Sequence, residues 1–221
     1  MQQTTGSAEK LNTLLAKIES ARQTFLSQIS PLSQGQFDFK PGRDEWSVGE
    51  VAHHVAITEE GFQSTLRELL EKGGQSGSAI KNIGIDELAL GPSMIPQRVL
   101  QGMLQFPGIR APMSLGMTLM PDFIKSFILA NPIMKIRTAP ALEPKAGQPR
   151  QKVLGQLKSL RAATLALVEP LGDKDLSRYR WQHPLFGSRD IYSTIEMLAD
   201  HDQRHLIQIE RIKRARAFPS V

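Results

Sequence analysis

Four long stretches of the chain place apolar residues three or four positions apart, which predicts four amphipathic helices. They cover residues 8–29, 47–72, 148–169 and 188–217. Alternating apolar and polar runs rich in Val, Ile and Thr are scarce, so we expect no convincing strand. The pattern therefore predicts an all-α fold in which the four helices form a bundle.

Polar residues mark where these helices begin. Ser7 is the expected N-cap of the first helix. Ser47 and Glu50 have the spacing of a capping box, in which each side chain accepts a hydrogen bond from the other residue's backbone amide. The fourth helix is expected to open at Ser188 or Asp190.

The segments between the helices differ in length and character. Residues 30–45 and 173–187 are predicted to be loops, whereas residues 73–147 form a long excursion between the second and third helices. The excursion is rich in Pro and contains six of the eight methionines: Met94, Met103, Met113, Met117, Met120 and Met134.

We interpret residues 73–147 as short helices and irregular loops that cover the bundle or form a crossover. A lid on a substrate pocket and a dimer surface are the alternatives, because Met-rich surfaces adapt to irregular partners. A crossover of this length would let the second and third helices run in the same direction. We treat residues 1–221 as a single domain with this insertion.

The composition narrows the chemistry. Apolar residues make up 40% of the chain and charged residues 22%, as in an ordinary globular protein. The chain has no cysteine, which excludes disulfides, thiolate ligands and a cysteine nucleophile. A metal would have to bind to His and carboxylate, which suits zinc, nickel, iron or manganese better than copper(I). A cysteine-free chain also fits a cytoplasmic location.

Targeting, membrane and nucleic-acid functions are not indicated. The N-terminus is polar and lacks the basic start and apolar stretch of a signal peptide, and no run predicts a transmembrane segment. The net charge of +5 is partly located in the last helix, where cations suit the helix dipole. No aromatic residues interleave with these charges, so we expect no nucleic-acid partner.

The strongest candidate for chemistry is HDQRH, residues 201–205, within the fourth helix. His201 and His205 are four residues apart and share one helix face, so both can bind one metal ion. His54 is the expected third ligand, because it falls on the core line of the second helix, whereas His53 falls at the rim. His183 is a further pocket candidate in the loop before the fourth helix.

Three other residues are expected to line or support this site. Glu50, four residues before His54, could accept a hydrogen bond from an imidazole N–H. Thr58 and Gln208 continue the two lines of histidines on their helices. The competing interpretation is that the histidines are core residues held by ordinary hydrogen bonds.

HDQRH also has a partial likeness to HExxH, the zinc-protease motif in which Glu is the general base. Asp202 replaces that Glu and is one carbon shorter, and the chain ends soon after the motif, with no further His or Glu at the expected distance. A metal-dependent hydrolase is therefore only an alternative.

The motifs WSVGEVAHHV and HPLFGSRDIYSTIEMLADHDQRHLIQIERI resemble the DinB/YfiT superfamily. That pattern has a Trp-Ser opening to the second helix, one His about eight residues on, and a late HxxxH followed by Gln-Ile. The matching residues are Trp46, Ser47, Glu50, His54, His201, His205, Gln208 and Ile209. The resemblance covers about residues 8–72 and 148–214, and not the Met-rich excursion.

The resemblance implies an up-down-down-up four-helix bundle with a three-His metal site. It further implies a transferase that uses a low-molecular-weight thiol on a small electrophilic substrate, with zinc or nickel ahead of iron or manganese. Homodimers are common in such proteins, so a homodimer is expected. The alternative is a non-catalytic bundle that binds metal or serves dimerisation or partner binding.

Overall fold

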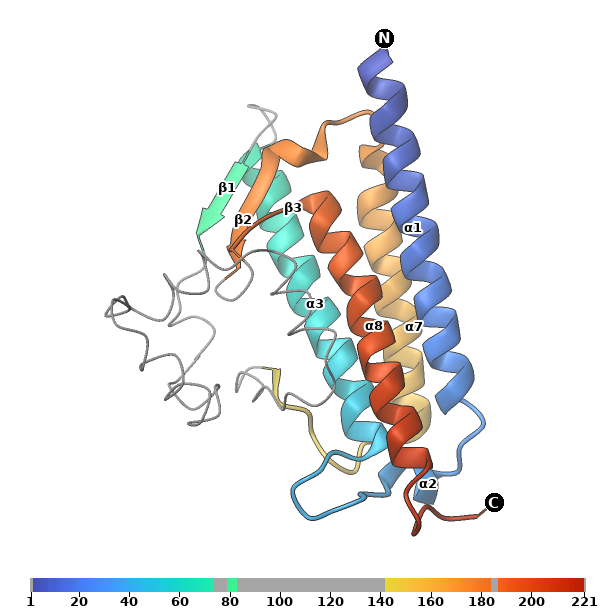
Figure 1. Ribbon diagram of the computed structural model, residues 1–221. Helices are drawn as coiled ribbons and strands as arrows, with labels where there is room; N and C mark the ends of the chain where they lie inside the picture. Colours follow the sequence, from blue (N-terminus) through green and yellow to red (C-terminus); the bar gives the residue numbers. More distant parts are fainter. Residues whose placement is uncertain (1, 74–78, 83–141, 184–186, 221) are drawn as a thin grey trace, which may run out of the picture.

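The computed structural model describes residues 2–73, 79–82, 142–183 and 187–220 (Figure 1). Four long helices dominate it: α1 (Gln2–Ile29), α3 (Val48–Gly73), α7 (Arg150–Val168) and α8 (Ile191–Lys213). The prediction of a four-helix bundle is confirmed, with each predicted helix found close to its expected position.

The helices follow the up-down-down-up path that the resemblance implied (Figure 1). α1 packs mainly against α8, and α3 packs against both α7 and α8. The neighbours α3 and α7 run in the same direction, which requires a crossover between them. The segment 83–141, which contains most of the predicted crossover, lies outside the described residues.

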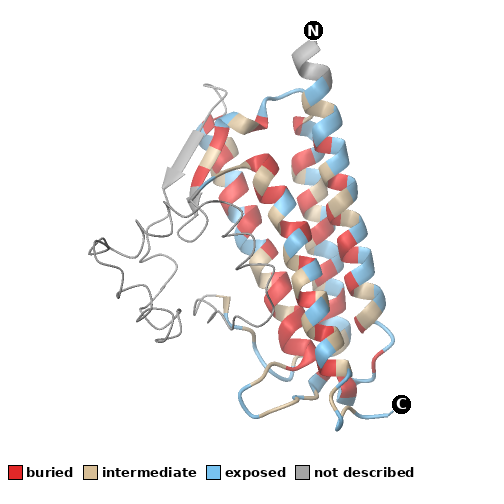
Figure 2. Ribbon diagram, viewed as in Figure 1, coloured by how far each residue is buried: buried red, intermediate tan, exposed pale blue. Residues whose placement is uncertain are grey.

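Buried positions line the inner faces of the four helices (Figure 2). They form two apolar clusters at different heights along the bundle. One contains residues such as Ile18, Leu66 and Ile195, and the other contains residues such as Phe25 and Val55.

The helix starts follow the expected capping chemistry with one exception. The Ser47 amide donates to Glu50 Oε2 at 2.8 Å, and the Glu50 amide donates to Ser47 Oγ at 3.1 Å, as the capping box predicts. Asp190 caps α8 and accepts a hydrogen bond from the amide of Ser193. The prediction for Ser7 is wrong, because α1 already begins at Gln2 and residue 7 lies inside the helix.

The expectation of no strand and of plain loops between the helices is also wrong. The short helix α2 (Gln34–Asp38) occupies part of the first loop. A small sheet with the order β1-β2-β3 lies at one end of the bundle (Figure 1). Its strands are β1 (Ala79–Asn82), β2 (Tyr179–His183) and β3 (Gly187–Asp190), with β1 parallel and β3 antiparallel to β2.

These strands escaped prediction because they are four or five residues long and show little alternation. Trp181 in β2 is buried, and its indole N–H donates to Thr194 Oγ1 on α8 at 2.9 Å. Packing on the bundle therefore stabilises the sheet. Within the described ranges, no helix is long and apolar enough to cross a membrane.

A layer of four charged side chains separates the two apolar clusters. Each long helix contributes one of them: Arg22 from α1, Glu59 from α3, Arg161 from α7 and Asp202 from α8. All four are at most 2% exposed. Charged side chains are rarely buried to this extent unless they are paired.

The four charges pair completely. Arg22 donates from Nε and Nη2 to the two carboxylate oxygens of Asp202, at 2.8 and 2.9 Å, and its Nη2 lies 2.7 Å from Glu59 Oε2. Arg161 donates to Glu59 Oε1 at 2.9 Å and to Asp202 Oδ2 at 3.3 Å. Burial alone would raise the pKa of Glu59, but the two guanidinium groups outweigh it and lower that pKa.

We predict that Glu59→Gln destabilises the protein by about 3–5 kcal/mol, because it leaves two buried guanidinium groups facing one carboxylate. Urea unfolding followed by circular dichroism measures this loss at neutral pH. The effect should shrink in acid, because a group whose pKa is lowered on folding stabilises the fold only above that pKa.

The matched control is Glu196→Gln, which removes a carboxylate that pairs with Lys17 at 3.1 Å on the surface between α1 and α8. The side chains of Lys17 and Glu196 are 37% and 54% exposed, so this change should cost less than about 1 kcal/mol. Equal losses in the two variants would show that the buried layer has no special role in stability.

Candidate metal centre

Three histidines from two helices meet inside the bundle. His54 comes from α3, and His201 and His205 come from successive turns of α8. The ring centroid of His54 lies 5.2 Å from that of His201 and 4.9 Å from that of His205, and the latter two are 4.4 Å apart. One nitrogen from each ring can be chosen so that all three lie within 4.8 Å of one another. Tertiary structure therefore brings together the residues that the spacing singled out.

The structure also distinguishes the adjacent histidines of α3. His54 is buried, whereas His53 is partly exposed and its Nδ1 accepts a hydrogen bond from the amide of Lys145. Successive residues of a helix point about 100° apart, so only one of them can face α8. The predicted orientation, with His54 inward and His53 at the rim, is confirmed.

Acceptor groups orient two of the three rings. His54 Nδ1 lies 2.9 Å from the backbone carbonyl oxygen of Leu142, and His205 Nδ1 lies 2.9 Å from Gln208 Oε1. A carbonyl oxygen can only accept, so in the neutral ring each Nδ1 carries the proton. Nε2 of both His54 and His205 therefore carries a lone pair, and Nε2 is the atom through which each ring would bind a metal.

The spacing of the ring nitrogens of the α8 pair fits a shared metal ion. Nε2 of His201 and Nε2 of His205 are 3.1 Å apart. Two nitrogens bound to one tetrahedral zinc at about 2.0–2.1 Å would be separated by about 3.3 Å. Without an ion, His201 can instead donate to His205 through this contact, as the competing interpretation requires, but that leaves the Nε2 lone pair of His54 unused.

The surroundings keep all three rings neutral. Burial is the main cause of the lowered pKa of each histidine, and it lowers the pKa of His205 to about 3. The neighbouring histidines and the positive charges of Arg22 and Arg204 lower the pKa of His201 further. Neutral imidazole is the form that binds a metal, so no proton has to be removed first.

The supporting residues only partly match their predicted roles. Gln208 does contact a histidine, as expected for a residue on that line. Glu50 does not, because its carboxylate accepts from the Ser47 amide and from Lys40 Nζ, and the Leu142 carbonyl takes the place predicted for it. Backbone carbonyls have no sequence signature, so Leu142 could not have been predicted.

The two remaining candidates for lining the site are Thr58 and His183. Thr58 follows His54 by one turn of α3, and its hydroxyl oxygen is buried without a hydrogen-bond partner among the described residues. His183 is the last residue of β2, and its side chain lies outside the described part of the structure.

Asp202 is not placed to act as the base of a zinc protease. Although it is adjacent to His201, it points into the charged layer and accepts hydrogen bonds from Arg22 and Arg161. These contacts were not predicted, although Arg22 and Glu59 interrupt apolar stripes in the sequence. A charged residue at a stripe position is the signal that could have revealed the layer.

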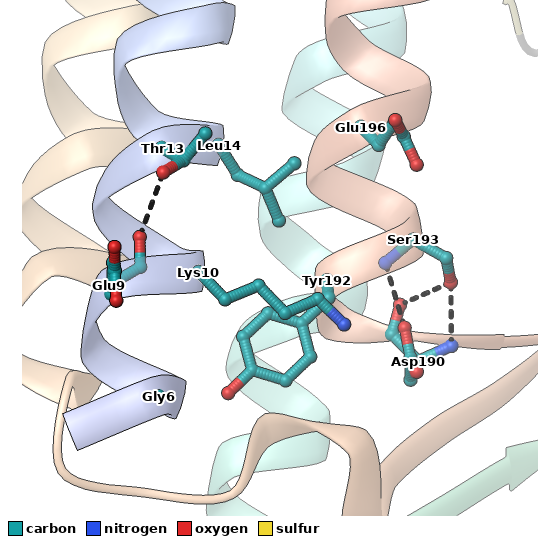
Figure 3. Close-up of a pocket in the computed structure, with 9 residues that line it drawn as sticks. All are labelled: Gly6, Glu9, Lys10, Thr13, Leu14, Asp190, Tyr192, Ser193 and Glu196. Carbon is teal, nitrogen blue, oxygen red and sulfur yellow. Dashed lines mark hydrogen bonds between the residues drawn. The ribbon is translucent and has the colours of Figure 1, made fainter. Parts of the chain in front are cut away.

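A separate hollow of about 530 Å³ lies between the start of α1 and the start of α8 (Figure 3). The ammonium group of Lys10 lies 4.3 Å from the ring centroid of Tyr192 there, and Asp190 and Ser193 form the cap of α8. These contacts serve the fold, and no histidine is among the described residues that line the hollow. Within the described part of the chain, the cluster that could hold a metal is the one formed by the three histidines.

One of the comparisons with known proteins identifies a family. The family model of the DinB superfamily matches residues 17–209, a range that includes all three histidines. No curated protein and no solved structure matches the chain.

We predict that His54→Ala abolishes binding of Zn²⁺ or Ni²⁺, whereas His53→Ala leaves it unchanged, because only His54 faces the α8 pair. Metal content after loading and desalting, measured by elemental analysis, gives the stoichiometry. Equal metal content in the two variants would contradict the assignment.

Tryptophan fluorescence offers a second readout of the same site. The ring centroid of Trp46 lies 5.0 Å from that of His54, so Ni²⁺ binding should quench Trp46 emission. The quenching should persist in Trp181→Phe and disappear in Trp46→Phe.

We predict that metal uptake at pH 6.0 releases almost no protons from the histidines, because their pKa values are already lowered. Three ordinary histidines would release roughly two protons at this pH. Calorimetric titrations in buffers of different ionisation enthalpy measure the number. A release near two would show that the rings are not held neutral.

Proposed function

The chain belongs to the DinB superfamily, and on that premise we propose that His54, His201 and His205 bind one divalent metal ion. The observation that carries the proposal is the convergence of three neutral imidazoles, two of which have their Nε2 lone pairs set by carbonyl acceptors. Zinc and nickel suit three imidazole ligands, with iron and manganese as the alternatives.

The ligand set favours a catalytic over a structural ion. Among the described residues, the cluster contains these histidines and no carboxylate or other ligand-forming side chain. Three protein ligands leave at least one coordination position for an exogenous ligand, which is typical of catalytic zinc sites. An ion bound there would lower the pKa of a thiol or water.

We assign the activity to transfer of a low-molecular-weight thiol onto a small electrophilic substrate. The thiol loses its proton to solvent, its sulfur forms a bond to an electrophilic carbon, and the leaving group departs with its electron pair. The Leu142 carbonyl and Gln208 hold the rings of His54 and His205, and the buried layer holds α3 and α8 in place.

Two alternatives are less well supported. A hydrolase would require a general base, and Asp202 is already engaged by two guanidinium groups. A non-catalytic bundle with a structural metal would need a closed site, which the three histidines of the described residues do not provide by themselves.

The remaining proposals concern the organisation of the protein. We propose that residues 1–221 act as one unit in which the 73–147 segment is an insertion. We also propose that the protein is a cytoplasmic homodimer, an expectation that rests on the resemblance and on the cysteine-free composition.

We predict that His201→Ala lowers the metal-dependent rate of thiol transfer roughly 100-fold or more, because a site with two ligands no longer holds the ion. A panel of thiols with 1-chloro-2,4-dinitrobenzene reports S–C bond formation and chloride release by absorbance.

The matched control is His53→Ala, which alters the neighbouring histidine of α3 and leaves the cluster intact. It should keep both the metal and the rate. A His201→Ala protein that retained both metal content and activity would refute the proposed function.

A further inference from the structure

Thr58 differs from other helical threonines of this protein. Thr13, Thr24 and Thr65 each donate a hydrogen bond to the carbonyl oxygen four residues earlier, at 2.9, 2.9 and 3.2 Å. The Thr58 hydroxyl is buried and makes no such bond to the carbonyl of His54, nor any other within the described ranges. An unsatisfied buried hydroxyl costs free energy, so its presence needs an explanation.

The position of Thr58 supplies one. It lies one turn beyond His54 on the same face of α3, the face that packs on α8. α3 and α8 run in opposite directions (Figure 1), so the step from His54 to Thr58 follows α8 from His205 back towards His201. The unpaired hydroxyl therefore lies on the histidine side of α3.

The charge at the site indicates what kind of group the hydroxyl would meet. Imidazoles bind a metal as neutral ligands, and among the described residues no carboxylate belongs to the cluster to offset the charge of a bound ion. Of the two carboxylates next to His201 in the sequence, Asp202 is paired with arginines within the charged layer, and Asp200 pairs with Lys17 on the surface. A divalent ion would increase the positive charge, so the site favours an anionic ligand.

We propose that Thr58 is a ligand-positioning residue whose hydroxyl donates a hydrogen bond to an anion that shares the three-histidine site with the ion. This inference rests on the proposed metal binding and adds a specific contact for the exogenous ligand. On this proposal, the Thr58 hydroxyl makes no hydrogen bond to the helix backbone because its partner is the bound anion.

The probe is sodium azide added to protein loaded with Co²⁺, whose visible absorption reports changes in coordination. Thr58→Val should keep the Co²⁺ content and weaken azide binding roughly threefold to tenfold, the effect of losing one hydrogen bond. Thr58→Ser should keep most of the affinity, because it retains the hydroxyl.

Thr65→Val is the matched control, because Thr65 lies on the same helix and its hydroxyl already has a partner in the Gly61 carbonyl. It should leave azide binding unchanged.

The stability of the metal-free protein provides a second measurement, in which the substitution should be favourable. Thr58→Val should raise its melting temperature by about 2–4 °C, because valine removes an unsatisfied hydroxyl without changing the shape of the side chain.

The outcomes separate the two proposals. If the wild-type protein binds no metal, the proposed function fails and this inference fails with it. If it binds Co²⁺ but azide does not change the spectrum, or if Thr58→Val binds azide as tightly as the wild type, metal binding stands and the role of Thr58 is overturned.

Discussion

The buried layer of two arginines and two carboxylates is the interaction on which the rest of the bundle depends. Arg22, Glu59, Arg161 and Asp202 come from different helices, and each arginine contacts both carboxylates. Apolar packing is tolerant of small rotations and slides, whereas bidentate pairing such as that of Arg22 with Asp202 has a defined geometry. The layer therefore fixes the height and rotation of each helix more sharply than the two apolar clusters can.

That constraint bears directly on the histidines because Asp202 is adjacent to His201. When Asp202 points into the layer, the rotation of α8 is set, and His201 and His205 must face α3. Glu59 does the same for α3, five residues after His54. The layer is neutral overall and fully paired, yet its Arg22 still contributes, with Arg204, to the positive potential that helps burial lower the pKa of His201.

Helix positions and the inward histidine could be predicted because both follow from a local rule. A period of 3.6 residues gives the apolar faces, and capping residues give the starts of α3 and α8. The same period decides between His53 and His54. The small sheet could not be predicted, because its paired strands β1 and β2 are about 100 residues apart in the chain and follow different helices, α3 and α7. Leu142 contributes a backbone carbonyl, which any residue type would provide.

The sequence by itself determined the four helices, the face that each buries, and the histidines that share those faces. These follow from side-chain spacing along a regular backbone, which requires no knowledge of other segments. Only the tertiary structure decided that His54 meets His201 and His205, that Arg22 and Arg161 neutralise Asp202, and that Leu142 orients a ring. These contacts join residues far apart in the chain, so they depend on how whole helices pack against one another.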